Sequence, residues 1–318
     1  MNCSSTETMP IDFSGKSCSY CGSTKQKSFL AEERMLGLHD QFQYLECLAC
    51  GSLQIAESPK NLGDYYPKEY YSFLELSRSN GFIRFLKKIR MSAFRSFGIF
   101  PPRFGYWLKK LQIHKTSRIA DVGCGNGQLL YELYCGGFER LEGFDPFIDQ
   151  EVRLTEELIL FPTEIKEAKS GFDLIMMHHS FEHMEDPKRV LQTCWEKLQP
   201  GGELLIRVPV ADSQVWKEKG SMWVQLDAPR HLTIPTVKGL SQLAEEIGFE
   251  LREILFDSSD FQFWGTELYS RGEKLNRDRL GDFFSSKELK EMQKKALQFN
   301  QEGNGDQACF YFLKPFKS

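Results

Sequence analysis

Short apolar runs alternate with amphipathic helical patterns through residues 117–256 of the 318-residue chain. Helical periodicity follows the first run, where Leu129, Leu130 and Leu133 share one face. It recurs at 188–198 and at 236–247, where Gly248 ends the pattern. Regular alternation of strands and helices predicts a parallel α/β sheet with helices on its faces. The runs that predict its strands lie at 117–122, 141–145, 158–161, 172–178 and 203–208.

The first predicted strand ends in a glycine-rich loop, Ile-Ala-Asp-Val-Gly-Cys-Gly-Asn-Gly, at residues 119–127. Glycines at 123, 125 and 127 permit a tight turn and a close approach of the backbone to a ligand. The loop is not a dinucleotide fingerprint, because Gln128 stands where the third glycine, counted from Gly123, would be needed. Asp121 closes the strand just before the loop, and a carboxylate suits a cationic ligand better than a pyrophosphate.

The sequence Asp-Val-Gly-Cys-Gly-Asn-Gly resembles motif I of the class I methyltransferases that depend on S-adenosylmethionine (SAM). The resemblance implies a seven-stranded Rossmann-like α/β domain, in which strands six (249–256) and seven (306–315) pair antiparallel. It also implies that Asp121 lies near the methionine end of SAM and that the loop wraps the cofactor. The loop residues expected to contact SAM are Gly123, Cys124, Gly125, Asn126 and Gly127.

A second acid, Asp145, ends the next predicted strand 18 residues after Gly127. In nucleoside-binding α/β folds an acid at about this distance, roughly 20 residues past the loop, accepts hydrogen bonds from ribose hydroxyls. We therefore expect Asp145 to bind the ribose of SAM, the alternative being an ordinary acid in a turn.

Three of the six histidines lie in one turn after the strand at 172–178. This stretch resembles methyltransferase motifs IV to VI, and ligands of parallel sheets lie at the carboxyl ends of strands. We expect His178 and His179 to contact SAM, and Glu182 and His183 to serve catalysis, His183 as a general base. Two alternatives stay open. Glu182 can simply brace the turn, or His179, Glu182 and His183 can hold a metal, as an acid followed by Glu-His does in some quinone-precursor O-methyltransferases.

The stretch Asp227-Ala-Pro-Arg-His-Leu has an acid, a proline, an arginine and a histidine within five residues, which is unusual for a loop that only connects two elements. Arg230 could clamp a phosphate or carboxylate, and His231 could act as base or donor. The alternative is a salt-bridged loop that orders the entrance to the site. The stretch resembles a signature of zinc-ribbon-bearing, methyltransferase-23-like enzymes of bacterial small-molecule and cell-envelope pathways.

Two similar knuckles near the N-terminus each read Cys-x-x-Cys-Gly-Ser. Two residues between cysteines let both thiolates reach one metal, and two such pairs complete a tetrahedral zinc site. Four sulfurs leave no open position, so the Zn²⁺ is expected to be structural. The alternatives are reduced pairs without metal or a redox pair. The predicted ligands are Cys18, Cys21, Cys47 and Cys50.

We expect three parts along the chain: a four-cysteine zinc ribbon at 1–60, a helical basic and aromatic segment at 61–115, and a SAM-binding domain at 116–318. Residues 81–110 contain no acid, and their apolar positions fit one helical face. The plain interpretation packs this face on the main domain; the alternative is contact of residues 82–110 with an anionic partner such as a membrane. An insertion at about 257–305 is expected to shape the acceptor pocket or a lid.

The totals set limits on function. A net charge of −4 argues against a chain built mainly to coat nucleic acid, and no apolar run approaches the roughly 20 residues of a membrane span. Nine cysteines without an export signal favour a reducing compartment, the cytoplasm. We therefore expect a SAM-dependent methyltransferase acting on a small molecule, such as a sugar or a cell-envelope or secondary-metabolite precursor. An RNA methyltransferase that uses the zinc ribbon to hold RNA, and a SAM-binding protein without activity, are the alternatives.

Overall fold

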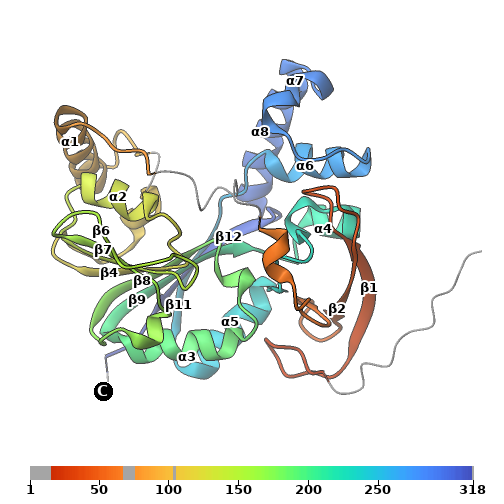
Figure 1. Ribbon diagram of the computed structural model, residues 1–318, viewed down its shortest axis with the longest axis horizontal. Coiled ribbons are helices and arrows are strands. Elements are labelled where there is room, and N and C mark those ends of the chain that lie inside the picture. Colours follow the sequence, from red (N-terminus) through yellow and green to blue (C-terminus); the bar gives the residue numbers. More distant parts are fainter. Residues whose placement is uncertain (1–15, 67–75, 103–104, 317–318) are drawn as a thin grey trace, which may run out of the picture.

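The computed structural model describes residues 16–66, 76–102 and 105–316, and these form two sheets (Figure 1). The larger sheet has the strand order β11-β12-β9-β8-β4-β5-β7-β6. Its central strands run parallel, while β12 lies antiparallel between β9 and β11. The strands are β4 (Arg118–Val122), β5 (Arg140–Phe144), β6 (Val152–Arg153), β7 (Leu158–Phe161), β8 (Phe172–His178), β9 (Leu198–Pro209), β11 (Glu250–Phe256) and β12 (Gln307–Leu313).

Alternate residues of the strands enter two separate cores, one on each face of this sheet. On β8, Ile175 and Met177 belong to one core and Leu174 and Met176 to the other. Helix α2 (Gln128–Cys135) covers the second face, and α3 (Pro187–Lys197) and α5 (Val237–Ile247) cover the first (Figure 1). The predicted class I α/β fold is confirmed. Only the edge strand β6 was not predicted, because two residues carry no periodicity.

The smaller sheet is built mainly from the N-terminal segment, with the order β1-β2-β3-β10. Strands β1 (Gln26–Glu32) and β2 (Gln41–Cys47) form the predicted ribbon, and β3 (Leu53–Ile55) follows. Its fourth strand, β10 (Thr233–Ile234), comes from the predicted SAM-binding domain and pairs antiparallel with β3. The predicted domain boundaries stay predictions, and one sheet is shared across the boundary at residue 60.

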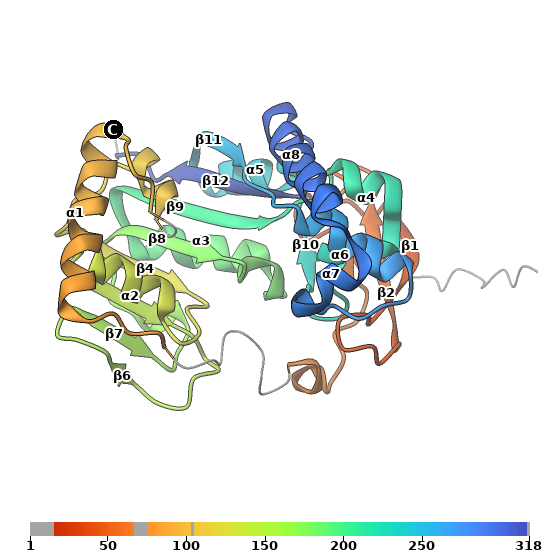
Figure 2. The ribbon, with the colours of Figure 1, turned by 90° about the horizontal axis from the view of Figure 1, so that it is seen from above.

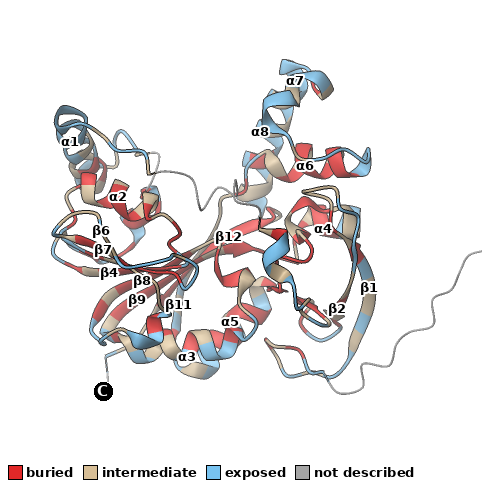
Figure 3. Cartoon of the chain, in the orientation of Figure 1, coloured by how far each residue is buried: buried red, intermediate tan, exposed pale blue. Residues whose placement is uncertain are grey.

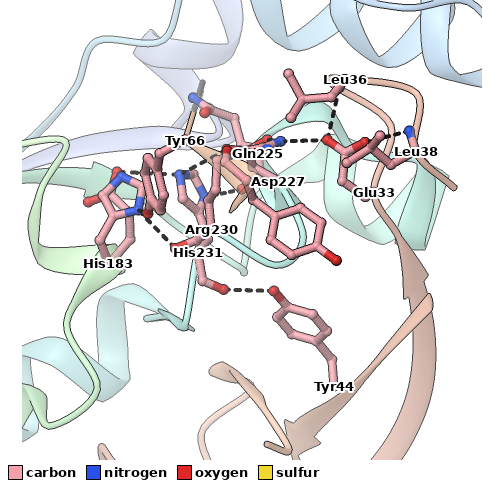
Figure 4. A network of polar contacts seen from close by, with 12 residues as sticks. Glu33, Leu36, Leu38, Tyr44, Tyr66, His183, Gln225, Asp227, Arg230 and His231 are labelled. Carbon is pink, nitrogen blue, oxygen red and sulfur yellow. Dashed lines mark hydrogen bonds and ion pairs between the residues drawn. The ribbon is translucent and has the colours of Figure 1, made fainter. Parts of the chain in front are cut away.

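A buried guanidinium fastens the ribbon to the larger domain (Figure 4). Arg230 is fully buried and donates to both oxygens of Asp227, at 2.9 and 2.6 Å. It also donates to Glu33, just after β1, at 3.1 Å, and to the carbonyl of Tyr65 at 3.1 Å. Both carboxylates thus have hydrogen-bond donors, and Glu33 also accepts from the amides of Leu36 and Leu38, so no charged group here is buried without a partner.

Helix α1 (Gly81–Phe97) packs on α2 with a different face from the one expected. Arg84, Lys87, Met91 and Phe94 share the face that meets the domain, where Lys87 pairs with Glu132 at 2.6 Å. The apolar stripe stays in solvent, contrary to the plain interpretation of the sequence (Figure 3). Its exposed members are Phe82, Phe85, Leu86 and Ile89. The reason is that polar contacts to α2 take the place of apolar ones along the first half of the helix.

The predicted insertion is helical and lies at the opposite end of the molecule from α1 (Figure 2). It contains α6 (Phe261–Ser270), α7 (Leu280–Phe283) and α8 (Ser286–Glu302), and only Ala296 of α8 is buried. The charged part of the insertion is thus a solvated helix. A short α4 (Gln214–Lys219) follows β9. No helix of the described chain is long and apolar enough to span a bilayer.

Replacing Arg230 with Met is expected to lower the free energy of unfolding by about 3–5 kcal/mol, because it leaves Glu33 and Asp227 buried without their cation. Urea denaturation measures the change. Arg279→Met removes an exposed ion pair with Asp282 and is the matched control, expected to cost less than about 1 kcal/mol. Equal losses in the two variants would contradict the assigned role of Arg230.

Candidate active site

The loop between β4 and α2 has a backbone that glycine alone fits. Gly123 and Gly127 have φ of 76° and 78°, in the left-handed region. A Cβ at Gly123 would lie 2.4 Å from Cβ of Ser180, and one at Gly127 would lie 2.8 Å from Cδ1 of Leu160. The turn is therefore tight on both sides, as predicted for a loop that closes around a ligand.

Asp145 holds the loop in shape. Its carboxylate accepts from the amide of Gly125 at 2.8 Å and from the amide of Phe147 at 2.9 Å. Each oxygen has a second lone pair, so the carboxylate retains the capacity to accept from ligand hydroxyls. The ribose role of Asp145 fits this geometry and stays a prediction.

Asp121 lies beside the loop and is 3% exposed. Burial, and then the negative charge of Asp145, raise the pKa of Asp121 to about 8. Two carboxylates held together with little solvent favour a cationic ligand, whose charge would lower that pKa again. SAM carries an ammonium and a sulfonium, so the chemistry of the site fits it.

The side chains of two predicted loop residues, Cys124 and Asn126, contact other parts of the protein. Cys124 points into the sheet, since a Cβ at Gly143 would lie 2.6 Å from its Sγ. Asn126 accepts from the amide of Gln128, the first residue of α2, at 3.0 Å. Contact of Cys124 with a cofactor would therefore come from its backbone.

The two histidines at the end of β8 are engaged by the protein. The ring of His178 lies 4.3 Å from that of Trp107, and burial lowers the pKa of His178 well below its usual value. His179 accepts at Nε2 from Arg207 at 2.9 Å, which leaves its proton on Nδ1. Their predicted contact with SAM stays a prediction.

The turn after β8 touches the glycine loop through Ser180, which donates to the carbonyl of Val122 at 2.6 Å. Glu182 and His183 follow in a short 3₁₀ turn (Phe181–His183). The amide of Leu232 donates to the carbonyl of Glu182 at 2.8 Å and brings the 227–232 stretch alongside. The structure thus brings the two candidate stretches together.

Glu182, His183 and His231 form a cluster in which one ligand atom of each lies within 4.8 Å of the others. Figure 4 shows the two histidines side by side. His231 donates from Nδ1 to the carbonyl of Gln225 at 2.7 Å, and its Nε2 lies 3.9 Å from Oε1 of Glu182. Burial, and then the charge of His183, lower the pKa of His231 to about 4, so its imidazole is neutral at pH 7. A base of so low a pKa is weak at that pH, which argues against His231 as the group that removes a proton.

Arg230 is occupied by Asp227 and Glu33 and is not free to clamp a substrate, so the salt-bridged alternative describes this loop. The sequence did not single out Glu33. It drew attention to Tyr66 only as one of the clustered aromatic residues of the predicted 61–115 segment, which are Tyr65, Tyr66, Tyr70, Tyr71 and Phe73. Glu33 pairs across 197 residues, and the hydroxyl of Tyr66 lies 3.1 Å from Nδ1 of His183 across 117 residues. No local pattern signals contacts of such separation. The other predicted aromatics of this segment, Tyr70, Tyr71 and Phe73, lie outside the described residues.

The four ribbon cysteines converge on one point. Sγ of Cys18 lies 3.6 Å from that of Cys50, and Sγ of Cys21 lies 3.5 Å from that of Cys47. Sulfurs around one tetrahedral zinc are separated by about 3.8 Å, whereas a disulfide joins them at about 2 Å. These four thiols can hold a metal.

The strand order, the glycine loop and the acid pair together define a class I SAM-dependent methyltransferase domain. Residues 100–254, just under half of the chain, match the family model described as a methyltransferase domain. The predicted class of enzyme and its cofactor SAM are thereby confirmed.

Curated relatives include the tRNA U34 carboxymethyltransferases of Helicobacter pylori and Azotobacter vinelandii. The first is 27% identical over 154 residues, covering 44% of this chain and 59% of the relative. The second is 29% identical over 147 residues, covering 42% and 45%. The chain thus spans about three fifths or less of these relatives. Among solved structures, a cyclopropane synthase from Mycobacterium tuberculosis is 16% identical, covering 65% of this chain and 81% of that one, with a TM-score of 0.43.

These relatives correct the predicted acceptor. The sequence analysis favoured a small molecule and regarded nucleic acid as an improbable partner, whereas the curated relatives act by name on tRNA. The small-molecule prediction came from the resemblance of the 227–232 stretch to enzymes of small-molecule pathways. The net charge of the whole chain does not describe its local surfaces and could not correct it.

Asp121→Asn tests the acid pair. At pH 7 Asp121, with a pKa of about 8, is mostly protonated, and binding of cationic SAM favours its ionised form. Wild-type protein should therefore release about one proton on binding, and its affinity should rise up to roughly tenfold per pH unit toward pH 8. Titration calorimetry in buffers of different ionisation enthalpy counts the protons. The Asn variant should release none from this position; unchanged proton release would refute the assignment.

Proposed function

We propose that this protein transfers a methyl group from SAM to a nucleotide of RNA, with tRNA as the substrate. The observation that carries the proposal is the similarity to curated enzymes that modify tRNA. The proposal includes a cytoplasmic location, because the substrate is an intracellular RNA.

In this proposal the glycine loop and the two acids bind SAM, Asp121 at its methionine end and Asp145 at its ribose. The cluster of Glu182, His183 and His231 faces the acceptor, since Ser180 links its turn to the loop. The acceptor atom forms a bond to the methyl carbon as the carbon–sulfur bond breaks, in line, and S-adenosylhomocysteine leaves. The sulfonium is already activated, so alignment of the two reactants supplies most of the rate.

Helix α1 offers a surface suited to RNA. Its solvent-exposed stripe combines Phe82 and Phe85, 71% and 60% exposed, with the exposed cations Lys88 and Arg90. Aromatic faces stack on unpaired bases, and cations contact phosphates. The segment before α1 reaches the cofactor loop, because the amide of Ser77 donates to Gln128 at 2.8 Å. RNA bound along α1 would therefore extend toward the site.

The four-cysteine group is proposed to hold structural Zn²⁺. Its second knuckle packs on the start of α5, where Thr236 donates to the carbonyl of Cys50 at 2.7 Å. The hydroxyl of Tyr44 on β2 donates to the carbonyl of His231 at 2.8 Å. The zinc would thus support the acceptor side of the site through the ribbon.

Methyl transfer from labelled SAM to tRNA, ribosomal RNA, protein and small-molecule fractions tests the function. Label is expected in tRNA, and mass spectrometry of the digested nucleosides identifies the added group. Asp121→Asn is the blank, and Lys88→Glu with Arg90→Glu should weaken RNA binding and lower the salt slope by about one per lost phosphate contact.

The matched control is Lys287→Glu with Lys290→Glu on the exposed face of α8, far from α1, which should leave RNA binding unchanged. Label confined to protein or small molecules would overturn the proposal. Equal effects of the two charge reversals would remove α1 from it.

Removal of zinc by a chelator is expected to speed amide exchange in β1–β3 and in residues 231–236, which bond to them, while SAM affinity stays largely unchanged. Cys47→Ala should reproduce the effect and lose the metal in elemental analysis. Cys194→Ala, which removes a buried thiol from the larger core, is the control and should retain the metal. Complete loss of SAM binding in the zinc-free protein would contradict the separation of the two sites.

A further inference from the structure

Glu182 is fully buried, and its carboxylate forms no hydrogen bond of normal length. Neither carboxylate oxygen has a hydrogen-bond partner among the described residues. The nearest ring nitrogen, Nδ1 of His179, lies 3.5 Å away, beyond a normal N–H···O bond. A buried carboxylate in such a setting is unfavourable unless a cation compensates it.

The rings of His183 and His231, beside Glu182, are each oriented by a hydrogen bond at Nδ1. The lone pair of the other ring nitrogen is then available to a ligand. Carbonyl oxygens can only accept, so Nδ1 of His231, bonded to Gln225, and Nδ1 of His183, bonded to Arg230 at 2.8 Å, both carry protons. In the neutral rings Nε2 is then unprotonated. Nε2 of His231 faces Oε1 of Glu182 at 3.9 Å, so two electron-rich atoms point toward one another.

His179 is excluded as a ligand by the same reasoning. Arg207 donates to its Nε2, so the other nitrogen carries the proton and points toward Glu182. His179 therefore orients the carboxylate from behind. A carbonyl or carboxylate contact on the far nitrogen of each ligand, and a donor behind the carboxylate, are the usual supports of a metal site.

We propose that Glu182, His183 and His231 bind a divalent transition metal ion, separate from the four-cysteine site. Two imidazoles and one carboxylate suit Zn²⁺, Fe²⁺, Co²⁺ or Ni²⁺, whereas Mg²⁺ and Ca²⁺ prefer oxygen ligands alone. The set differs from the one that sequence spacing suggested, because His231 from a distant stretch replaces His179.

The ion would lie beside the methyl donor, because Ser180 joins this turn to the glycine loop. With three protein ligands it keeps open positions, and it can bind an acceptor oxygen and favour its ionised form. This role rests on the proposed function, whereas the binding of the ion does not.

Metal uptake by the full chain, with zinc already in the four-cysteine site, tests the proposal without SAM or RNA. Co²⁺ is the probe, followed by its visible absorption and by elemental analysis. Wild-type protein should bind one equivalent of Co²⁺ whose spectrum lacks sulfur-to-metal charge transfer. Glu182→Gln and His231→Gln should each weaken binding by roughly 100-fold or more, and His179→Gln by roughly 10-fold.

His114→Gln changes an exposed histidine elsewhere on the surface and should leave Co²⁺ binding unchanged. Thermal melts confirm that each variant is folded, and a variant that fails to fold is replaced by His183→Gln. The proposal is overturned if wild-type protein takes up no Co²⁺ beyond the cysteine site, or if the ligand variants bind it as tightly as wild type. Metal binding without methyl transfer to RNA would refute the function and leave the metal site standing.

Discussion

The buried charge of Arg230 is the interaction on which the arrangement of the site depends. It joins the ribbon at Glu33, the 227–232 stretch at Asp227 and the chain at Tyr65 in a single hydrogen-bonded group. Because this group is closed to solvent, the cation and its acids stay together or the whole junction loosens. His231, next in sequence, takes its position from that junction, and Tyr44 of the ribbon bonds its carbonyl.

The two ends of the proposed site share one electrostatic feature: each places a buried carboxylate where a positively charged ligand would stabilise it. At the proposed cofactor end, burial and the charge of Asp145 raise the pKa of Asp121 to about 8, and a cationic ligand would lower that pKa again. At the proposed metal site, the carboxylate of Glu182 lies 3.9 Å from Nε2 of His231, at the point where we propose a second cation. Each end is unfavourable by itself and becomes favourable when its positive partner arrives. Both ends therefore favour a positively charged ligand over a neutral or negatively charged one.

Local patterns predicted most of the fold, because strand and helix periods leave a direct trace in the sequence. The runs that became β4, β5, β7 and β8, the glycine loop and the paired cysteines were all recognisable. The features that the sequence did not predict depend on tertiary contacts. The contacts of Arg84 and Lys87 with α2 orient α1 so that its apolar stripe faces water. Glu33, Tyr66 and the tautomer of His179 follow from partners far away in the chain, which no window of sequence contains.

The pairing of β10 with β3 has a consequence for how such enzymes diversify. Because β10 of the larger domain completes the sheet of the ribbon, one part cannot be exchanged without the strand that the other contributes. Transplanting the ribbon alone onto a related catalytic domain would leave β3 with an open edge and Glu33 with no counterion. A viable chimera has to carry residues 227–236 with the ribbon, so these two stretches are expected to change together through evolution.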